Sequence, residues 1–341
     1  MSKPVSSSMT LNVGIIGLGV GEAHIAGYEK HPGCKVGALC DFDRQKIETA
    51  REKYKDRKIT DEADDILTAP DIQVVSIASY DSYHHAQTVK AVESGKHVFV
   101  EKPLCLSAQE AKDIRAALNR KPQLKLSSNL ILRLCPRFQA LKEKIDAGLF
   151  GDVFHIEGDY QYGRLHKVTE GWRGKIDFYS VVYGGGVHII DLFLWLTGRR
   201  VTEVAAFGSN FTGRGTQFKF DDSVTAVMKF DNGMTGKMSV HFGCAKPHYH
   251  SLNVFGTKAT FENTLDYGLF YNSTDPASKP EKMEQAYPGV HKGGLIYDFV
   301  QSIIENRESL VSRDEVFDAM SICFAIEEAK STGKPVKVQY I

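Results

Sequence analysis

The residues best suited to chemistry in this sequence are Glu101, Lys102 and Pro103, which end the apolar run from Val98 to Val100. Ligands bind at the carboxyl ends of strands in an open α/β sheet, so the run predicts a strand with a lysine at its tip. Partial burial there would lower the pKa of the Lys102 ammonium, and the proline would hold the lysine backbone extended. A salt-bridged strand end is the alternative interpretation, so the meaning of the tripeptide depends on the rest of the chain.

A glycine turn upstream favours the chemical interpretation. Gly17-Leu18-Gly19-Val20-Gly21 follows the apolar run 13–16 and opens a predicted helix. The first glycine permits a tight turn, the second lets the backbone approach a pyrophosphate, and the helix start supplies N–H donors. The usual position of the third glycine is Glu22, so Gly21 would serve in a loop one residue shorter. The predicted cofactor contacts of this turn are Gly17, Gly19, Val20 and Gly21.

The second predicted strand ends at Asp41, 24 residues after Gly17. A carboxylate at this place would accept hydrogen bonds from the adenosine ribose hydroxyls and repel a 2′-phosphate. The cofactor is therefore expected to be NAD rather than NADP. A helix cap ahead of Asp43 and Arg44 is the alternative role for Asp41, and both roles are compatible.

Residues 11–129 alternate between strand and helix patterns, which predicts a doubly wound parallel sheet. The expected strands are 13–16, 36–40, 74–78, 97–101 and 124–127, and the expected helices are 21–30, 44–55, 83–93 and one opened by Ser107.

The pattern changes after Pro136. A helix over 137–147 precedes longer strands of alternating character, and Asn232-Gly233 between two such runs predicts a hairpin. Further strands are expected at 251–255 and 269–271. Half-buried antiparallel strands of this kind predict an open-faced sheet that has helices on one side. Such a face could instead be buried against a second subunit.

The composition excludes several functional classes. The 341 residues carry 42 Lys+Arg and 42 Asp+Glu, so no net positive charge favours nucleic acid or an anionic membrane. No apolar run reaches the roughly 18 residues of a membrane span, and residues 1–10 are expected to be a disordered lead. The six cysteines are scattered without a C-x-x-C pair, which favours reduced thiols in the cytoplasm.

The separated motifs together resemble the Gfo/Idh/MocA oxidoreductases, the group of glucose–fructose oxidoreductase and inositol dehydrogenase. The motifs that carry the resemblance are Gly17-x-Gly19 with His24, Ser79 to His84, Gly95 to Val98 with Glu101-Lys102-Pro103, Asn129 with Arg133-x-x-Pro136, and Gly185 to Asp191 with Trp195 and Gly198.

The resemblance implies an NAD-binding Rossmann domain over 11–128. Over 129–341 it implies a substrate-binding and oligomerisation α/β domain with a large, mostly antiparallel, open-faced sheet. It implies oxidation or reduction of a hydroxyl on a sugar, nucleotide sugar or cyclitol, and homodimers or homotetramers built through the open sheet. It also implies cofactor contacts from Ser79, His84, Glu101 and Lys102, with Ser79 and His84 beside the nicotinamide.

Oxidation of a secondary alcohol needs a hydride acceptor and a base. Lys102 would hydrogen-bond the reacting oxygen, and His188 is the better proton acceptor because an imidazole titrates near neutrality. Many members of the family place an aspartate four residues before this histidine, and here that position is Gly184. Asp191 is the third predicted catalytic residue, because it lies three residues after His188 on the same helix face. A helix-start role for Asp191 remains open.

The predicted substrate contacts are Asn129, Arg133, Trp172, Arg173 and Tyr183. An aromatic face suits a pyranose, arginine suits a carboxylate or phosphate, and Tyr183 is the second choice of acid or base. No metal site is expected, since the adjacent His84 and His85 face different directions and no thiol or carboxylate cluster lies near His248 and His250.

Two other functional classes remain open. A non-catalytic NAD-binding sensor on the same fold would explain Gly184, since fold alone does not establish function. A Rossmann methyltransferase fits the strand and helix order but leaves Glu101-Lys102-Pro103 without a role.

Overall fold

The computed structural model describes residues 10–341, so the predicted lead over 1–10 lies outside the described residues except for Thr10. The chain forms two compact units. The first unit contains the chain up to Ile131 together with His291–Phe317 and Ile341, and the second contains Leu132–Val290 and Asp318–Tyr340. Among residues 10–341, no helix combines the length and the apolar composition that crossing a membrane requires.

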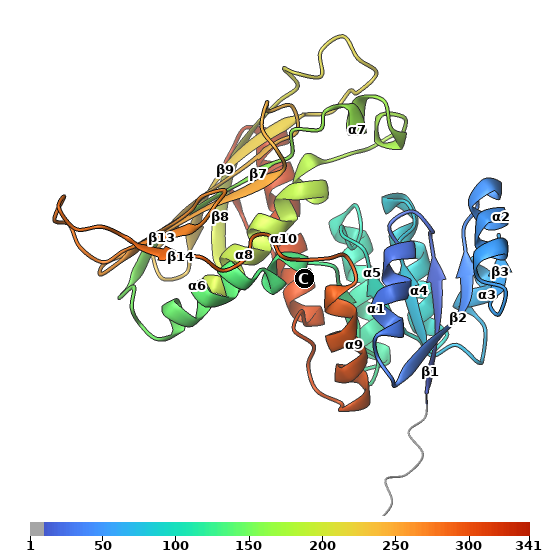
Figure 1. The fold of residues 1–341 in the computed structure, drawn as a ribbon. Coiled ribbons are helices and arrows are strands. Elements are labelled where there is room, and N and C mark those ends of the chain that lie inside the picture. The colour runs from blue at the N-terminus through green and yellow to red at the C-terminus, as the bar shows by residue number, and fades with distance from the viewer. Residues whose placement is uncertain (1–9) are drawn as a thin grey trace, which may run out of the picture. The chain divides into compact units, whose positions relative to one another are not determined.

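The first unit is built on a parallel sheet with the strand order β3-β2-β1-β4-β5-β6 (Figure 1). Its strands are β1 (Leu11–Ile16), β2 (Cys34–Cys40), β3 (Lys58–Thr60), β4 (Val74–Ile77), β5 (His97–Val100) and β6 (Leu126–Ser128). Neighbouring strands in this order run parallel to each other. This order is that of a dinucleotide-binding Rossmann fold, and it confirms the predicted doubly wound sheet.

Helices cover the parallel sheet, which explains its almost continuous apolar strands. They are α1 (Glu22–Glu29), α2 (Arg44–Lys53), α3 (Asp64–Leu67), η1 (Asp81–Tyr83), α4 (His84–Glu93), α5 (Ala108–Arg120) and α9 (Gly294–Ile304). The helix predicted to open at Ser107 is present, because the Ser107 hydroxyl caps α5 by accepting from the Glu110 N–H, and the Glu110 carboxylate accepts from the Leu106 N–H just before the cap.

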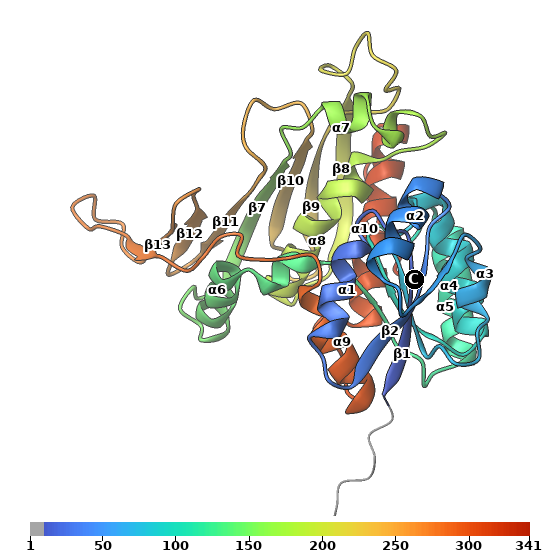
Figure 2. The same ribbon diagram turned by 45° about the vertical axis from the view of Figure 1, so that its right-hand side comes forward.

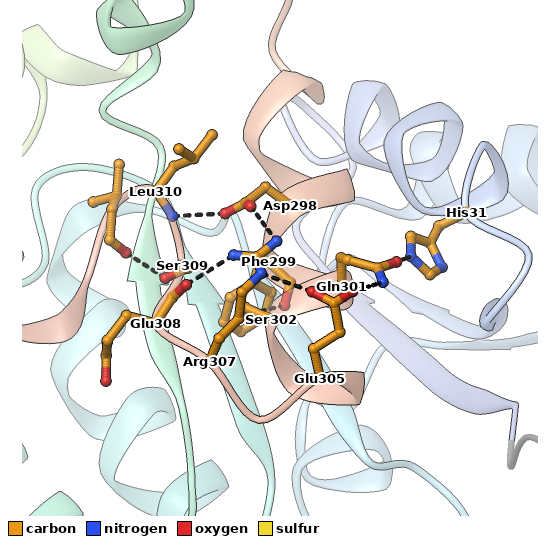
Figure 3. A network of polar contacts seen from close by, with 11 residues as sticks. His31, Asp298, Phe299, Gln301, Ser302, Glu305, Arg307, Glu308, Ser309 and Leu310 are labelled. Carbon is orange, nitrogen blue, oxygen red and sulfur yellow. Dashed lines mark hydrogen bonds and ion pairs between the residues drawn. The ribbon is translucent and has the colours of Figure 1, made fainter.

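Helix α9 returns to the first unit from far along the sequence and packs against α1 (Figure 1). A Cβ at Gly27 would lie 2.7 Å from the Gly293 carbonyl oxygen, so the two backbones approach closely. Figure 3 shows the polar contacts that hold this segment: His31 Nε2 lies 2.8 Å from Gln301 Oε1, and Arg307 pairs with Asp298.

The segment 291–317 therefore does not follow the predicted division into 11–128 and 129–341. The predicted boundary between residues 128 and 129, which separates a cofactor-binding part from a substrate-binding part, stays a prediction. The sequence pattern could not reveal the return of α9, because its partner helix lies about 270 residues earlier in the chain.

The second unit is built on a sheet with the strand order β14-β13-β12-β11-β7-β10-β9-β8-β15. Its strands are β7 (Val153–Gln161), β8 (Val201–Ser209), β9 (Ser223–Phe230), β10 (Thr235–His241), β11 (Tyr249–Gly256), β12 (Thr260–Asn263), β13 (Gly268–Tyr271), β14 (Glu281–Met283) and β15 (Val336–Lys337). Strand β10 pairs with β7 in parallel, and the other neighbouring strands of this sheet pair antiparallel. The prediction of a mostly antiparallel sheet is confirmed, including the hairpin at Asn232-Gly233, where Gly233 has φ of 89°.

Helices cover one face of this sheet. Apart from α9, the helical segments from residue 131 onwards are η2 (Ile131–Leu134), α6 (Pro136–Asp146), α7 (His166–Thr169), η3 (Trp172–Gly174), the π-helix η4 (Val182–Gly186), α8 (Val187–Thr197) and α10 (Arg313–Thr332). Helix α8 lies against β7 (Figure 2), where a Cβ at Gly158 would lie 2.7 Å from the Ile189 side chain. The opposite face carries polar groups such as the Lys237–Asp159 ion pair at 2.9 Å, and Phe207 and Val227 are exposed. The sheet is thus open-faced, as predicted.

Candidate active site

The glycine turn of the first unit is shaped for close approach. Gly17 has φ of 91°, and a Cβ there would lie 2.3 Å from the Ala78 carbonyl oxygen, so only glycine fits. A Cβ at Gly21 would lie 2.1 Å from the Gly17 carbonyl oxygen, so Gly21 supplies the tight helix–strand packing of a third glycine. At Gly19 the nearest atom to an added Cβ is Lys46 Nζ at 3.9 Å, so the turn is open there. These features fit the pyrophosphate of NAD.

Asp41 stands at the tip of β2 with a buried carboxylate. Its Oδ2 accepts from the Leu18 N–H at 2.7 Å and from Lys46 Nζ at 3.2 Å, and its Oδ1 accepts from the Asp43 N–H at 2.9 Å. The alternative role of Asp41 as a helix cap is wrong, because the N-cap of α2 is Asp43. Through its hydrogen bond from the Leu18 N–H, Asp41 instead connects the end of β2 to the glycine turn, so its carboxylate is held beside the turn.

The Glu101 carboxylate is the centre of a buried network at the ends of the parallel strands. Its Oε1 lies 3.1 Å from His24 Nε2 and accepts from Asn129 Nδ2 at 2.7 Å, while His24 Nδ1 lies 2.9 Å from Ser76 Oγ. Asn129 Nδ2 also donates to the Lys292 carbonyl oxygen at 3.0 Å. Glu101 and Asn129, predicted to contact cofactor and substrate, are thus brought together as mutual partners.

Burial raises the pKa of the Glu101 carboxyl, but His24, Lys102 and Asn129 outweigh burial and lower that pKa to about 2. Since the unperturbed value is 4.5, the ionised carboxylate stabilises the fold above about pH 4.5, and this contribution is lost as the pH falls towards 2. We expect a contribution on the order of 3 kcal/mol to the free energy of unfolding at neutral pH. Urea unfolding of a Glu101→Gln variant between pH 7 and 3 should show a flatter pH dependence than wild type.

The control for this prediction is Glu93→Gln, which neutralises a carboxylate that is exposed and paired with Arg120. That variant should keep the pH dependence of wild type. Equal slopes for Glu101→Gln and wild type would contradict the depressed pKa.

Two anchored neighbours position Lys102, which is half-buried directly after β5. On one side the Glu101 carboxylate is held by the network above. On the other side, the Pro103 carbonyl oxygen lies 2.6 Å from His84 Nδ1, whose ring is fully buried. The backbone around Lys102 is therefore fixed on both sides, which limits the directions that the lysine side chain can take.

The predicted nicotinamide loop, Ser79 to His84, is held by contacts within the protein. His84 Nε2 lies 3.2 Å from the Ser79 carbonyl oxygen, so the imidazole joins this loop to the segment after Lys102. The Ser79 hydroxyl donates to Gln87 Oε1 at 2.7 Å. His84 is placed to support the loop from within the protein, and its contact with a cofactor stays a prediction.

In the second unit, His188 lies in the first turn of α8 and stacks on Tyr160, with ring centroids 6.0 Å apart and ring planes at 14°. A Cβ at Gly185 would lie 2.6 Å from the Tyr160 ring, so this glycine makes room for the stack. His248 and His250 also pack on Tyr160, at 5.0 and 5.2 Å. Within the described residues, no three histidine, cysteine or carboxylate side chains are grouped to hold a metal ion.

His250 is held as a neutral imidazole. Burial lowers its pKa well below 6.5, and neighbouring His248 and His188 lower it further. Its Nδ1 lies 2.8 Å from the Tyr287 hydroxyl, which also accepts from the His250 backbone N–H at 2.7 Å. This residue therefore supports Tyr160 and His188 without adding charge.

Asp191 and Arg133 form a buried ion pair. Arg133 Nη2 donates to Asp191 Oδ1 at 2.6 Å, and Arg133 Nε lies 3.0 and 3.1 Å from the two carboxylate oxygens. Both side chains are at most 3% exposed. The pair joins the turn η2 to α8, so each predicted site residue is a partner of the other.

Of the remaining predicted substrate contacts, Trp172 and Arg173 lie against each other. The Arg173 guanidinium stacks over Trp172 at 4.4 Å and lies 5.8 Å from the Tyr179 ring. Tyr183 is buried between Phe178 and Phe324, at centroid distances of 5.9 and 5.7 Å.

Sequence reasoning missed Tyr160, Tyr179 and Tyr287. For Tyr160 a signal existed, because alternation along β7 places it on the same face as Ile156 and Gly158, towards α8. No local pattern marked Tyr179 or Tyr287, since their neighbours come from distant segments.

Two family models match most of the chain. The family model described as "Oxidoreductase family, NAD-binding Rossmann fold" matches residues 11–129, and that of the "GFO/IDH/MocA C-terminal domain" matches 138–262. The chain is 33% identical over 264 residues to an inositol 2-dehydrogenase/D-chiro-inositol 3-dehydrogenase of Lacticaseibacillus casei, which covers 76% of this chain and 74% of the relative. It is 25% identical to the Bacillus subtilis oxidoreductase YrbE over 96% of each chain.

Among solved structures, a levoglucosan dehydrogenase in complex with NADH and levoglucosan has the same fold. It superposes with a TM-score of 0.84 at 23% identity, over 97% of this chain and 100% of the other.

Proposed function

Because the chain belongs to the Gfo/Idh/MocA family of NAD-binding oxidoreductases, we propose that it transfers a hydride between NAD and a secondary hydroxyl of a sugar, nucleotide sugar or cyclitol. The observation that carries the proposal is Lys102, held between two anchored neighbours at the carboxyl edge of the Rossmann sheet. The substrate class is supported by the relative named for inositol and by the fold neighbour named for levoglucosan.

In the proposed reaction, Lys102, His188 and Tyr160 have separate roles beside the cofactor. NAD, when bound, accepts or returns the hydride. Lys102 donates a hydrogen bond to the reacting oxygen and stabilises its alkoxide character. His188 accepts the hydroxyl proton during oxidation and returns it during reduction. Tyr160 holds the imidazole plane by stacking.

The residues that would contact the substrate are proposed on chemical grounds. The Trp172 ring suits the apolar face of a pyranose or cyclitol, and Arg173 suits a carboxylate or phosphate on it. Tyr183 remains a candidate contact. Asn129 and Arg133 fit the proposal as supports, because their side chains bind Glu101 and Asp191.

Assembly and compartment complete the proposal. A homodimer or homotetramer through the open sheet face is supported by exposed Phe207 and Val227 on that face. Size-exclusion chromatography with light scattering, comparing wild type with Phe207→Ser/Val227→Ser, tests the assembly. The six free cysteines support a reducing, cytoplasmic compartment.

Turnover tests the proposed activity directly. Purified protein is incubated with NAD and each member of a panel of sugars, nucleotide sugars and inositols, and NADH formation is followed by absorbance. A rate with at least one polyol, and none with its deoxy analogue at the reacting carbon, is the expected result. Tight NAD binding without turnover of any panel member would overturn the proposal.

Cofactor choice provides a separate prediction. Replacing Asp41 by serine removes the charge that repels a 2′-phosphate, so the ratio of kcat/KM for NADP to that for NAD should rise about tenfold or more. Asp43→Ser is the matched control, because serine also caps a helix and the preference should stay as in wild type. An unchanged ratio in Asp41→Ser would remove the ribose role from Asp41.

A further inference from the structure

Gly184 departs from the aspartate that many family members carry at this position, and the space beside it is occupied. A Cβ at Gly184 would lie 2.2 Å from the Tyr179 hydroxyl oxygen and 2.9 Å from Tyr179 Cζ. No side chain fits at position 184 while Tyr179 keeps this place. The glycine and the tyrosine are therefore two parts of one arrangement.

The place of the Tyr179 hydroxyl is set by its surroundings. The residue is buried, and its ring packs on Phe218 and Phe242 at 6.0 and 6.2 Å. The next residue, Ser180, donates to Glu327 Oε1 at 2.6 Å and accepts from the N–H groups of residues 182 and 183. The start of η4 is thus anchored, and the hydroxyl has little freedom to leave position 184.

The His188 imidazole extends towards the same turn. Residues four apart share a helix face, and helical side chains lean towards the helix N-terminus. The Tyr160 ring confirms this direction, because it stacks on His188 while it touches the position of a Cβ at Gly185. The turn before His188 therefore presents Tyr160 at Gly185 and the Tyr179 hydroxyl at Gly184.

The charged and titratable groups near this turn come from α8, from β11 and the residues just before it, and from η3. The Asp191 carboxylate on α8 is paired with Arg133, and His250 on β11 is neutral. His248 precedes β11, and the Arg173 guanidinium lies on the Trp172 side of Tyr179. Buried Tyr160 has a pKa raised by burial and by Tyr162 and Tyr179, so it stays protonated.

We infer that the Tyr179 hydroxyl takes the place of a side chain at position 184 and serves as the neutral positioning group for His188 in the proposed proton transfer. The inference rests on the proposed function, since it assigns the polar partner of the same proton acceptor. A phenol orients the imidazole without stabilising its protonated form electrostatically, whereas a carboxylate at position 184 would do both.

Removal of the hydroxyl alone is the first test. Tyr179→Phe keeps the ring contacts, and we expect kcat to fall roughly tenfold to a hundredfold, less than for loss of a proton acceptor itself. KM and the melting temperature should change little. The matched control is Tyr340→Phe, which also removes a tyrosine hydroxyl of the second unit, one that donates to the Val201 carbonyl at 3.0 Å; its kcat should equal that of wild type. Unchanged kcat in Tyr179→Phe would overturn the inference.

Exchanging the tyrosine hydroxyl for a carboxylate should change the pH dependence of kcat/KM. A purely structural role of Tyr179 would leave that pH dependence unchanged. Tyr179→Leu vacates the space, and Tyr179→Leu/Gly184→Asp places a carboxylate in it. A carboxylate one turn before His188 stabilises the imidazolium, so more of the enzyme is protonated at a given pH. The acidic limb of kcat/KM for oxidation should move up by about one pH unit relative to wild type. The double variant should also be faster than Tyr179→Leu, and a profile equal to that of Tyr179→Leu would refute the inference.

The close approach of the Tyr179 hydroxyl to Gly184 can be tested without substrate. Gly184→Ala should lower the melting temperature in the wild-type background and have little effect in the Tyr179→Leu background. Equal decreases in melting temperature in both backgrounds would contradict the close approach of Tyr179 to Gly184. Wild type that turns over no polyol would overturn the proposed function, whereas active wild type with an unaffected Tyr179→Phe variant would overturn this inference alone.

Discussion

A Lys102→Met variant is expected to lose turnover by roughly 10³-fold while its affinity for NAD stays within a factor of about three. Methionine keeps the length of the stem but cannot donate a hydrogen bond to the reacting oxygen, so the alkoxide character that develops during oxidation is left unsupported. The neighbours that fix the lysine backbone, Glu101 and Pro103, keep their own partners in the variant. Steady-state kinetics and titration of protein fluorescence with NAD measure the two quantities separately.

The control is Lys112→Met, which replaces an exposed lysine on α5 and should behave as wild type. If NAD affinity falls in parallel with turnover in Lys102→Met, then the lysine binds the cofactor and does not serve the reacting oxygen.

The Asp191→Asn substitution is expected to lower the free energy of unfolding by about 3–5 kcal/mol. The Arg133 guanidinium is buried against the Asp191 carboxylate, and asparagine removes the negative charge that lies 2.6 Å from Arg133 Nη2. Urea unfolding at neutral pH measures the loss. In Arg133→Leu/Asp191→Leu both charges are removed together, so the double variant should recover much of the stability.

This experiment also decides between the two roles open to Asp191. Full stability together with a loss of kcat in Asp191→Asn would support the catalytic role that its spacing from His188 predicts. Loss of stability with kcat retained in the folded fraction would assign Asp191 to the support of α8.

Much of the first unit could be predicted because its signals are local. The glycine turn and the strand that ends in Glu101-Lys102-Pro103 each occupy fewer than about ten consecutive residues, and each follows from backbone sterics or from the burial of parallel strands. The partners of these residues could not be predicted. The spacing of Asp41 from Gly17 indicated a ribose contact, but its hold on the Leu18 N–H and on Lys46 depends on how β2 and α2 meet the turn.

The sequence by itself determined the class of this protein: a parallel dinucleotide-binding sheet, a mostly antiparallel second sheet, and the residue types of an NAD-dependent dehydrogenase. Periodicity and turn chemistry indicate the strands and the glycine turn, because they act between residues close in the chain, and the separated motifs indicate the dehydrogenase class through the family resemblance. Only the tertiary structure decided which side chains support which. It paired Asp191 with Arg133, returned α9 to the first unit, and filled the space at Gly184 with the Tyr179 hydroxyl. Those outcomes depend on close packing between distant segments, where a single missing Cβ determines which group fits.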